Sequence, residues 1–379
     1  MSEYQYYEFQ AIDKPLNTEQ REAVQDLSSR AIVNLHSAAF TYNYGDFRGS
    51  VKQLMGDMFD VMLYVANWGS QRLVMRIPKT LLTIKDLDAY CVGDVVSYFI
   101  KGEYVIIDCS FDDEEGYCDW IEGEGLLGNI LAIRNEIIQG DYRALYLAWL
   151  KAIDQVKEDE YHEDDIYNRL EPTVPAGLKK LSSAQRQFAK FMELDPILIE
   201  CAAEASTSFE ANQFQAEKWL HALSESEKED FLQRLCRNEP ALSLQLNKHL
   251  QSLAKIPSND QSQSDTQART VDVIYDSYEK IETRKRLEET RIAVAKQNLH
   301  LDAVKSREGY YWQEIPNLVL MSNAKAYDRA TTYLCDLQAL AIREKNIVTF
   351  ETKLLSITTK FSRRIAFIRR LKENNLISE

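Results

Sequence analysis

The chain has 379 residues, which at roughly 150 residues per domain predicts two or three domains. Hydrophobic residues make up 45% and charged residues 27%, which excludes wholesale disorder, a collagen-like fibre and a small disulfide-stapled protein. The formal net charge of −14 disfavours unspecific nucleic-acid binding by the whole chain. No motif indicates a particular reaction, so the sequence mainly predicts the architecture and the kind of partner.

The sequence also bears on the compartment. The first residues lack the basic and apolar segments of a secretory signal, and the longest apolar runs fall far short of the ~20 residues that a membrane span needs. The six cysteines never form a CxxC pair, which favours buried thiols over a disulfide framework. We therefore expect a cytoplasmic protein that does not enter a membrane.

Charge is distributed unevenly along the chain. Residues 1–110 carry a net charge of −4, residues 111–175 carry −12, residues 176–265 carry −3 and residues 266–379 carry +5. An acidic segment, residues 111–175, therefore separates a near-neutral front from a basic tail.

The first 122 residues are typical of an α+β module. Runs rich in β-branched and aromatic residues predict strands, and two pairs of runs predict antiparallel hairpins: 60–68 with 72–77, and 95–100 with 103–111. Asn17 and Gln20 have the spacing of a capping box, which predicts the start of a helix.

From about residue 125 the apolar residues repeat with the period of a helix. We expect a helical region over residues 123–254, built from short amphipathic helices, and an exposed, mobile linker over 255–268. A C-terminal helical region over 269–379 is expected to hold one long charged helix and a helical hairpin formed by residues 326–361.

Gly123, Gly125 and Gly128 form a GxGxxG pattern at an expected helix start. A dinucleotide site needs such glycines directly after a strand, where their N–H groups can meet a pyrophosphate. Here the expected strand ends near Phe111, and carboxylates flank the glycines. We interpret the pattern as a loop with a helix start rather than as a nucleotide site.

Metal and catalytic motifs give no positive signal. The acidic run 112–119 lacks the spacing of an EF-hand loop, so we interpret it as a solvated hairpin edge or a docking surface. The five histidines are scattered, and the chain has no HExxH, Cys/His knuckle or GxSxG motif. A catalytic triad built from distant residues stays open. We expect no cofactor and no metal.

Two charged clusters are candidate binding surfaces. The candidate partner-binding residues are acidic: Asp112, Asp113, Glu114, Glu115, Asp119 and Glu122. Such a concentration of charge is either tolerated in solvent or used to meet a basic partner. The candidate basic helix near the C-terminus carries Arg363, Arg364, Arg369 and Arg370. It could contact nucleic acid, but a solvated face that docks on the acidic segment is the simpler interpretation.

The opening Ser2-Glu-Tyr-Gln-Tyr-Tyr-Glu-Phe-Gln-Ala-Ile-Asp-Lys-Pro15 resembles the start of a family of uncharacterised bacterial proteins. Residues 64–69, 139–149 and 325–328 are similar to the same family, as is the basic end 361–376, although its Arg-Ile-Ala-Phe stretch departs from the usual form. The resemblance covers most of the chain and implies a shared fold but no activity.

We expect a non-enzymatic regulatory or adaptor protein that binds a basic protein partner through its acidic surface. The overall organisation of the chain is also similar to that of the regulatory part of a protease-substrate protein from type III-E CRISPR loci. This similarity implies that the protein restrains a sigma factor in bacterial defence. The alternative is an enzyme whose site is assembled from distant residues of the α+β module. Paired polar groups in a cleft near residues 64–68 and 109–120 would favour the enzyme, and an open acidic groove would favour the adaptor.

Overall fold

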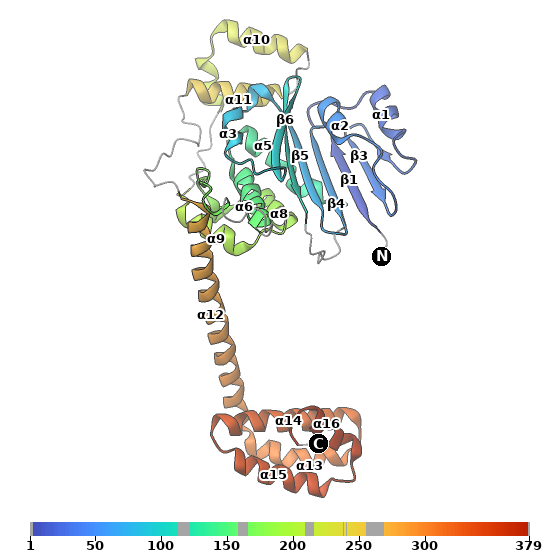
Figure 1. Ribbon diagram of the computed structural model, residues 1–379, viewed down its shortest axis with the longest axis vertical. Helices are drawn as coiled ribbons and strands as arrows, with labels where there is room; N and C mark the ends of the chain where they lie inside the picture. The colour runs from blue at the N-terminus through green and yellow to red at the C-terminus, as the bar shows by residue number, and fades with distance from the viewer. Residues whose placement is uncertain are drawn as a thin grey trace. The chain divides into compact units, whose positions relative to one another are not determined.

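In a computed structural model, the chain divides into two compact units, Met1–Ile281 and Glu282–Glu379 (Figure 1). The structure describes residues 3–112, 122–157, 166–208, 216–237, 239, 241–254 and 269–377. Among these residues an antiparallel sheet with helices is followed by helices alone, which confirms the expected α+β module and the helical regions after it. No described helix combines the length and the apolar character that a membrane span requires.

The sheet has seven described strands in the order β2-β3-β1-β4-β5-β7-β6, and all neighbours pair antiparallel. The strands are β1 (Gln5–Gln10), β2 (Ile32–Val33), β3 (Ser37–Tyr42), β4 (Val61–Ala66), β5 (Gln71–Pro78), β6 (Val96–Lys101) and β7 (Tyr104–Phe111). Both expected hairpins, β4–β5 and β6–β7, are confirmed. Gly69 and Gly102 take left-handed φ angles in the two turns, a conformation that favours glycine.

Side chains alternate between two faces of this sheet, and each face has its own core. On the first face, Phe9 lies opposite Met62, and both belong to a core shared with two short helices. These helices are α1 (Thr18–Gln25) and α2 (Val51–Asp57). On the second face, Leu63 and Cys109 belong to a larger core formed with the helices that follow the sheet.

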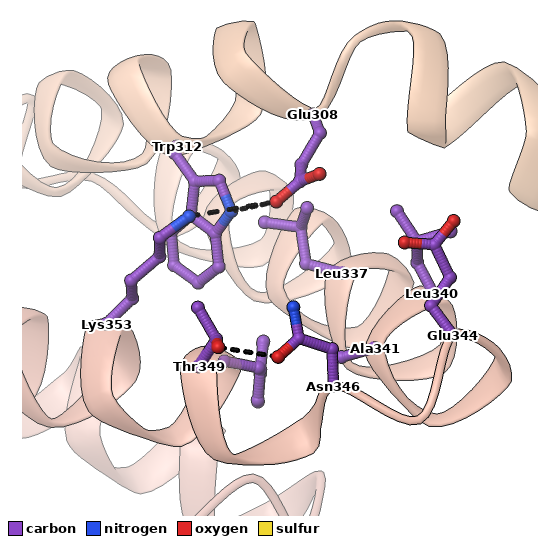
Figure 2. Close-up of a pocket in the computed structure, with 10 residues that line it drawn as sticks. Glu308, Trp312, Leu337, Leu340, Ala341, Glu344, Asn346, Thr349 and Lys353 are labelled. Carbon is purple, nitrogen blue, oxygen red and sulfur yellow. Dashed lines mark hydrogen bonds and ion pairs between the residues drawn. The ribbon is translucent and has the colours of Figure 1, made fainter.

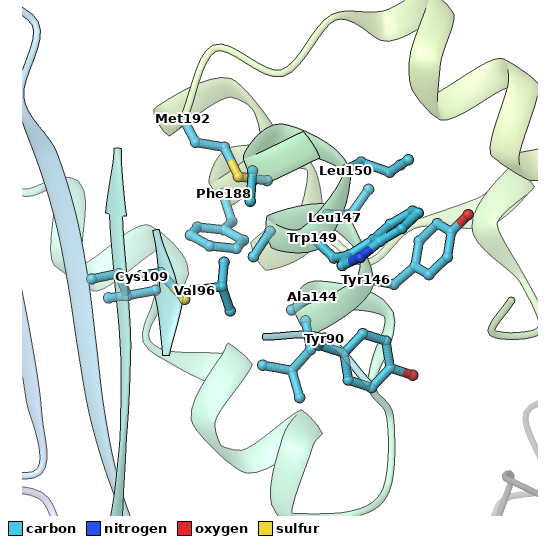
Figure 3. Packing of buried hydrophobic residues seen from close by; sticks show 14 of the residues in the cluster. Tyr90, Val96, Cys109, Ala144, Tyr146, Leu147, Trp149, Leu150, Phe188 and Met192 are labelled. Carbon is cyan, nitrogen blue, oxygen red and sulfur yellow. The ribbon is translucent and has the colours of Figure 1, made fainter. Parts of the chain in front are cut away.

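Helix α6 (Arg143–Lys157) is the centre of that larger core. Tyr146, Leu147, Trp149 and Leu150 are all fully buried, so this part of the helix is covered on every side (Figure 3). The other elements of the region are η1 (Lys79–Leu81), α3 (Ile84–Asp88), α4 (Leu126–Ile130), α5 (Ala132–Ile138), η2 (Leu178–Lys180), α8 (Ser183–Phe191), α9 (Pro196–Ala205), η3 (Ala216–Ala222), α10 (Glu225–Cys236) and α11 (Leu242–Leu253).

Capping boxes fix the starts of three of these helices. The Asn17 side chain accepts a hydrogen bond from the backbone N–H of Gln20 at 2.8 Å, and the Gln20 side chain accepts from the backbone N–H of Asn17 at 2.9 Å. This arrangement confirms the capping box expected from the spacing of the two residues. Ser182 and Ser224 begin α8 and α10 in the same way.

A buried network of two aspartates and two arginines joins the sheet to α5. Asp60 Oδ1 accepts hydrogen bonds from Arg76 at 2.8 and 3.1 Å, and Asp60 Oδ2 accepts from the backbone N–H groups of Ile12 and Asp13 at 2.7 and 2.9 Å. Arg134 donates to the Asp13 carboxylate at 2.7 and 3.1 Å and to the Arg76 carbonyl at 2.8 Å. Asp60 and Arg134 are 0% and 1% exposed, so protein partners replace water around these two charges.

Residues 269–281 also belong to the first unit. The Arg269 guanidinium donates to the Glu171 carboxylate at 2.6 and 2.7 Å, and backbone hydrogen bonds on both sides of this pair join the two segments. Ile274 and Ile281 are buried in the larger core. These contacts attach the start of the long helix to the first unit.

The boundary between the two units therefore differs from the domain boundaries that the sequence suggests. The expected modules 1–122 and 123–254 share one core, because helices from the second module cover the second face of the sheet. The boundary falls inside α12 (Val271–Ser306) rather than at residue 269, because the first residues of this helix pack in the first unit. The expected linker, 255–268, lies outside the described residues.

The second unit is a helical bundle. The expected hairpin is formed by α14 (Ala324–Arg343) and α15 (Ile347–Lys360), with Leu337 and Phe350 among the side chains of the shared core. The bundle also contains α13 (Glu308–Leu320), α16 (Ile365–Glu373) and the end of α12, whose Leu301 and Val304 belong to the same core.

The substitution Asp60→Asn tests whether the buried network holds the first unit together. It removes a negative charge and leaves Arg76 and Arg134 buried with incomplete compensation, so we expect a loss of about 3–5 kcal/mol in the free energy of unfolding. Urea titration at neutral pH measures this loss. Asp57→Asn is the control, because the Asp57–Lys101 pair is exposed and such pairs contribute about 0–1 kcal/mol. Equal losses in both variants would contradict this role of Asp60.

Candidate binding groove on the sheet

An open groove of about 290 Å³ lies on the first face of the sheet, next to the segment that leads into α2. Strands β1, β4, β5 and β7 contribute to it, together with residues 46–51. The side chains that set its chemistry are Tyr7, Asp46, Phe47, Tyr64, Arg72 and Asp112.

Strand pairing brings these residues together from distant parts of the sequence. Tyr7 lies opposite Tyr64, Tyr64 lies opposite Arg72, and Arg72 lies opposite Ser110. The neighbouring row on the same face is apolar from Phe9 through Met62 to Val74 and ends at Asp108. The groove therefore starts where the core beneath α1 and α2 ends.

Aromatic rings form one side of the groove. The Tyr7 ring stacks on Phe47 with centroids 4.7 Å apart and contacts Tyr64 with centroids 4.4 Å apart. A Cβ atom at Gly49 would lie 2.6 Å from the Phe47 ring, so only glycine lets this ring take its place. Gly49 therefore positions the aromatic side.

The two tyrosine hydroxyls share one acceptor. Both donate to Gln5 Oε1, from Tyr7 at 3.1 Å and from Tyr64 at 3.3 Å, while Gln5 Nε2 donates to the Gly45 carbonyl at 3.2 Å. Burial raises the pKa of Tyr7, and burial together with the nearby Tyr7 raises the pKa of Tyr64. Both side chains therefore stay protonated at neutral pH and act as hydrogen-bond donors rather than as bases.

The charged groups of the groove leave a net negative lining. The Arg72 guanidinium donates to both oxygens of Asp108, at 2.7 and 2.5 Å, and this hydrogen bonding raises the pKa of Arg72. Asp108 thus neutralises the cation. Asp46 and Asp112 are exposed and form no ion pair with another described residue. Two carboxylates therefore remain available to a ligand.

The expected acidic surface meets this groove at one residue. Asp112 lines the groove, and Glu122 is exposed. The positions of the other four, Asp113, Glu114, Glu115 and Asp119, lie outside the described residues. The sequence indicated residues 64–68, which include Tyr64, as a possible cleft, but it did not identify Tyr7, Arg72 or Phe47 as groove residues, because Tyr7 joins the row through β1–β4 pairing and Phe47 comes from the segment before α2.

The expected basic helix divides into two kinds of residue. Arg370 donates to Asp328 at 2.6 Å, and Arg369 forms an exposed pair with Glu373 at 3.3 Å. Arg363 and Arg364 precede α16 and form no ion pair with another described residue. Of these four arginines, the two without an ion pair among the described residues thus lie immediately before α16.

Packing and turn geometry account for two glycines of the GxGxxG pattern. A Cβ at Gly123 would lie 2.1 Å from the ring of Tyr6, and Gly125 has a φ angle of +80° just before α4. The space around Gly128 is open. These roles agree with the interpretation of the pattern as a loop with a helix start.

Glu8 lies next to Tyr6 on the second face of the sheet and is half-buried. It accepts a hydrogen bond from the Tyr6 hydroxyl at 3.1 Å. Burial raises the pKa of Glu8, while the hydrogen bond from Tyr6 partly opposes the rise. The ionised form of Glu8 therefore costs folding free energy at neutral pH.

A second cavity, of about 40 Å³, lies in the helical bundle (Figure 2). Trp312 Nε1 donates to Glu308 at 3.1 Å, Lys353 lies over the Trp312 ring, and Thr349 donates to Asn346 at 2.5 Å. This space suits water rather than a larger ligand. Among the described residues, no three His, Cys, Asp or Glu side chains gather as a metal site would need.

Comparison of the chain with models of protein families, with curated proteins and with solved structures finds no match.

A pair of glycine substitutions tests the packing of the groove. Gly49→Ala would force Phe47 away from Tyr7, so we expect a loss of about 1–3 kcal/mol in the free energy of unfolding. Gly128→Ala is the control, because its Cβ would enter open space in α4, and alanine should add up to about 1 kcal/mol there. Urea titration measures both. A Gly49→Ala variant as stable as the parent would show that Phe47 is not held in place.

We expect the substitution Glu8→Gln to increase the stability of the protein by an amount that depends on pH. The folded-state pKa of Glu8 is raised, so ionised Glu8 lowers the free energy of unfolding above that pKa. This loss of stability disappears as pH falls below the ordinary pKa of 4.5. The variant should therefore be more stable than the parent at pH 7, and the difference should vanish near pH 4. Thermal unfolding at both pH values measures it, with the exposed Glu22→Gln as control. A difference that does not change with pH would argue against a desolvation penalty.

Proposed function

We propose that this protein is a non-catalytic binding protein whose groove takes a basic segment of a partner protein. The observation that carries the proposal is the net negative lining, in which Asp46 and Asp112 lack partners among the described residues while Arg72 is neutralised by Asp108. A cation entering the groove would meet these two carboxylates and the aromatic side formed by Tyr7 and Phe47.

The state of the polar groups favours binding over catalysis. The tyrosine pKa values are raised, which is opposite to what a general base at neutral pH requires. The Tyr7 and Tyr64 hydroxyls already donate to Gln5, and both guanidinium bonds of Arg72 go to Asp108. An enzyme assembled from distant residues of the α+β module is the weaker proposal, since these groups serve one another.

The charge of the surrounding unit supports a basic partner. Residues 1–281 carry 27 Lys and Arg against 47 Asp and Glu. An excess of this size speeds the association of a positively charged partner and slows that of an acidic one. An adaptor or inhibitor role, such as restraint of a sigma factor in bacterial defence, fits this charge and stays a prediction.

Binding can be measured with a fluorescein-labelled peptide of alternating lysine and alanine. Anisotropy titration of the full chain at low ionic strength should show binding that weakens as salt is added. The double variant Asp46→Asn and Asp112→Asn should bind roughly twofold to thirtyfold more weakly, because each of the two exposed charge pairs contributes about 0.2–1 kcal/mol.

The matched control is Asp94→Asn with Glu103→Gln, which removes the same charge from exposed positions that do not line the groove. Its affinity should stay close to that of the parent. An equal loss in both double variants would mean that the general acidity of the unit attracts the peptide, and the groove proposal would be wrong. Stronger binding of a glutamate–alanine peptide would also overturn it.

A further inference from the structure

We propose that the second unit contacts the phosphate backbone of nucleic acid through its basic corner. The basic corner comprises five cationic residues at the end of α15 and along α16: Lys360, Arg363, Arg364, Arg369 and Lys372. This proposal does not depend on the function proposed for the groove.

The first support is the concentration of positive charge. Residues 352–372 hold seven Lys or Arg and no Asp or Glu. The whole unit, residues 282–379, carries 18 Lys and Arg against 12 Asp and Glu, whereas the chain as a whole is acidic. Since exposed charges act over ~8–10 Å at moderate salt, a phosphate at the basic corner responds to its own neighbours rather than to the total charge.

The second support is that several of these cations are available. Arg363 and Lys372 are exposed and Arg364 is half-buried, and none of the three forms an ion pair or side-chain hydrogen bond with another described residue. Arg370 differs, because Asp328 binds it at 2.6 Å. Arg370 is thus paired within the bundle, whereas Arg363 and Arg364 have no ion pair with any residue that the structure describes.

Arginine is suited to phosphate. Its planar guanidinium offers paired N–H donors that match two phosphate oxygens, and contacts of this kind position a protein on nucleic acid without reading sequence. Arg363 and Arg364 are adjacent in the turn before α16, so together they can contact neighbouring phosphates.

Other anionic partners fit the basic corner less well. A helix that lies on a membrane inserts its apolar side, but the apolar side of α16, with Phe367 and Leu371, is buried in the bundle core. An acidic protein would need an apolar contact to gain affinity, and within residues 360–373, all of which the structure describes, Ile365 is the sole large apolar side chain that is exposed. Nucleic acid needs only the cations.

The test uses the full chain and a fluorescein-labelled single-stranded DNA, with the matching duplex as a second probe. Anisotropy titrations should show binding at low salt. The logarithm of the association constant should fall linearly with the logarithm of the salt concentration. The double variant Arg363→Gln and Arg364→Gln should lose at least tenfold in affinity at low salt. The slope should become shallower by roughly 1.8 for the duplex and 1.4 for the single strand, because two phosphate contacts are removed.

The matched control is Lys296→Gln with Lys325→Gln, which removes the same charge from exposed positions of the second unit. Its affinity and slope should stay near those of the parent. The proposal is wrong if neither DNA binds at low salt, if the control loses as much as the arginine variant, or if the slope does not change. Tighter binding of polyglutamate or of vesicles with anionic lipid than of DNA would assign the basic corner to a protein or a membrane instead.

Discussion

The fold of the first unit depends on how the Asp60 carboxylate is satisfied. One of its oxygens accepts from Arg76, and the other accepts from the two backbone N–H groups that follow β1. A buried carboxylate without such partners would be too costly to keep ionised. Because Arg134 of α5 completes the network, the end of β1, the start of β4 and the first helices after the sheet are held at one point. This connection explains why the sheet and those helices form one unit.

The groove is a consequence of how this unit covers its sheet. The helices after the sheet bury the second face, while α1 and α2 bury only the part of the first face around Phe9. The next row on the first face, which contains Tyr7, Tyr64 and Arg72, therefore lies at the edge of that cover. Its side chains satisfy one another through Gln5 and Asp108 instead of through a helix, so the row can be polar and still belong to the fold.

Features that depend on neighbours in the sequence could be predicted, and features that depend on strand order could not. The capping box at Asn17, both hairpins and the helical period after residue 125 are local, and the structure confirms them. Tyr64 and Arg72 lie opposite each other in the predicted β4–β5 hairpin, but Tyr7 joins them only because β1 pairs with β4, which no local pattern reveals. Asp112 was named as a binding residue from the sequence because its charge belongs to a local acidic run, and Tyr64 lies in a range that the sequence indicated for a possible cleft.

Ion pairs within the protein determine which charged side chains remain available to a partner molecule. In the groove, Asp108 neutralises Arg72, so the cation that strand order places there does not cancel Asp46 and Asp112. In the bundle, Asp328 neutralises Arg370, but Arg363 and Arg364 have no such partner among the described residues. The net charge of −14 averages over both cases and cannot distinguish them. Since screening limits each charge to its surroundings, one chain can present an acidic groove in one unit and a basic corner in the other.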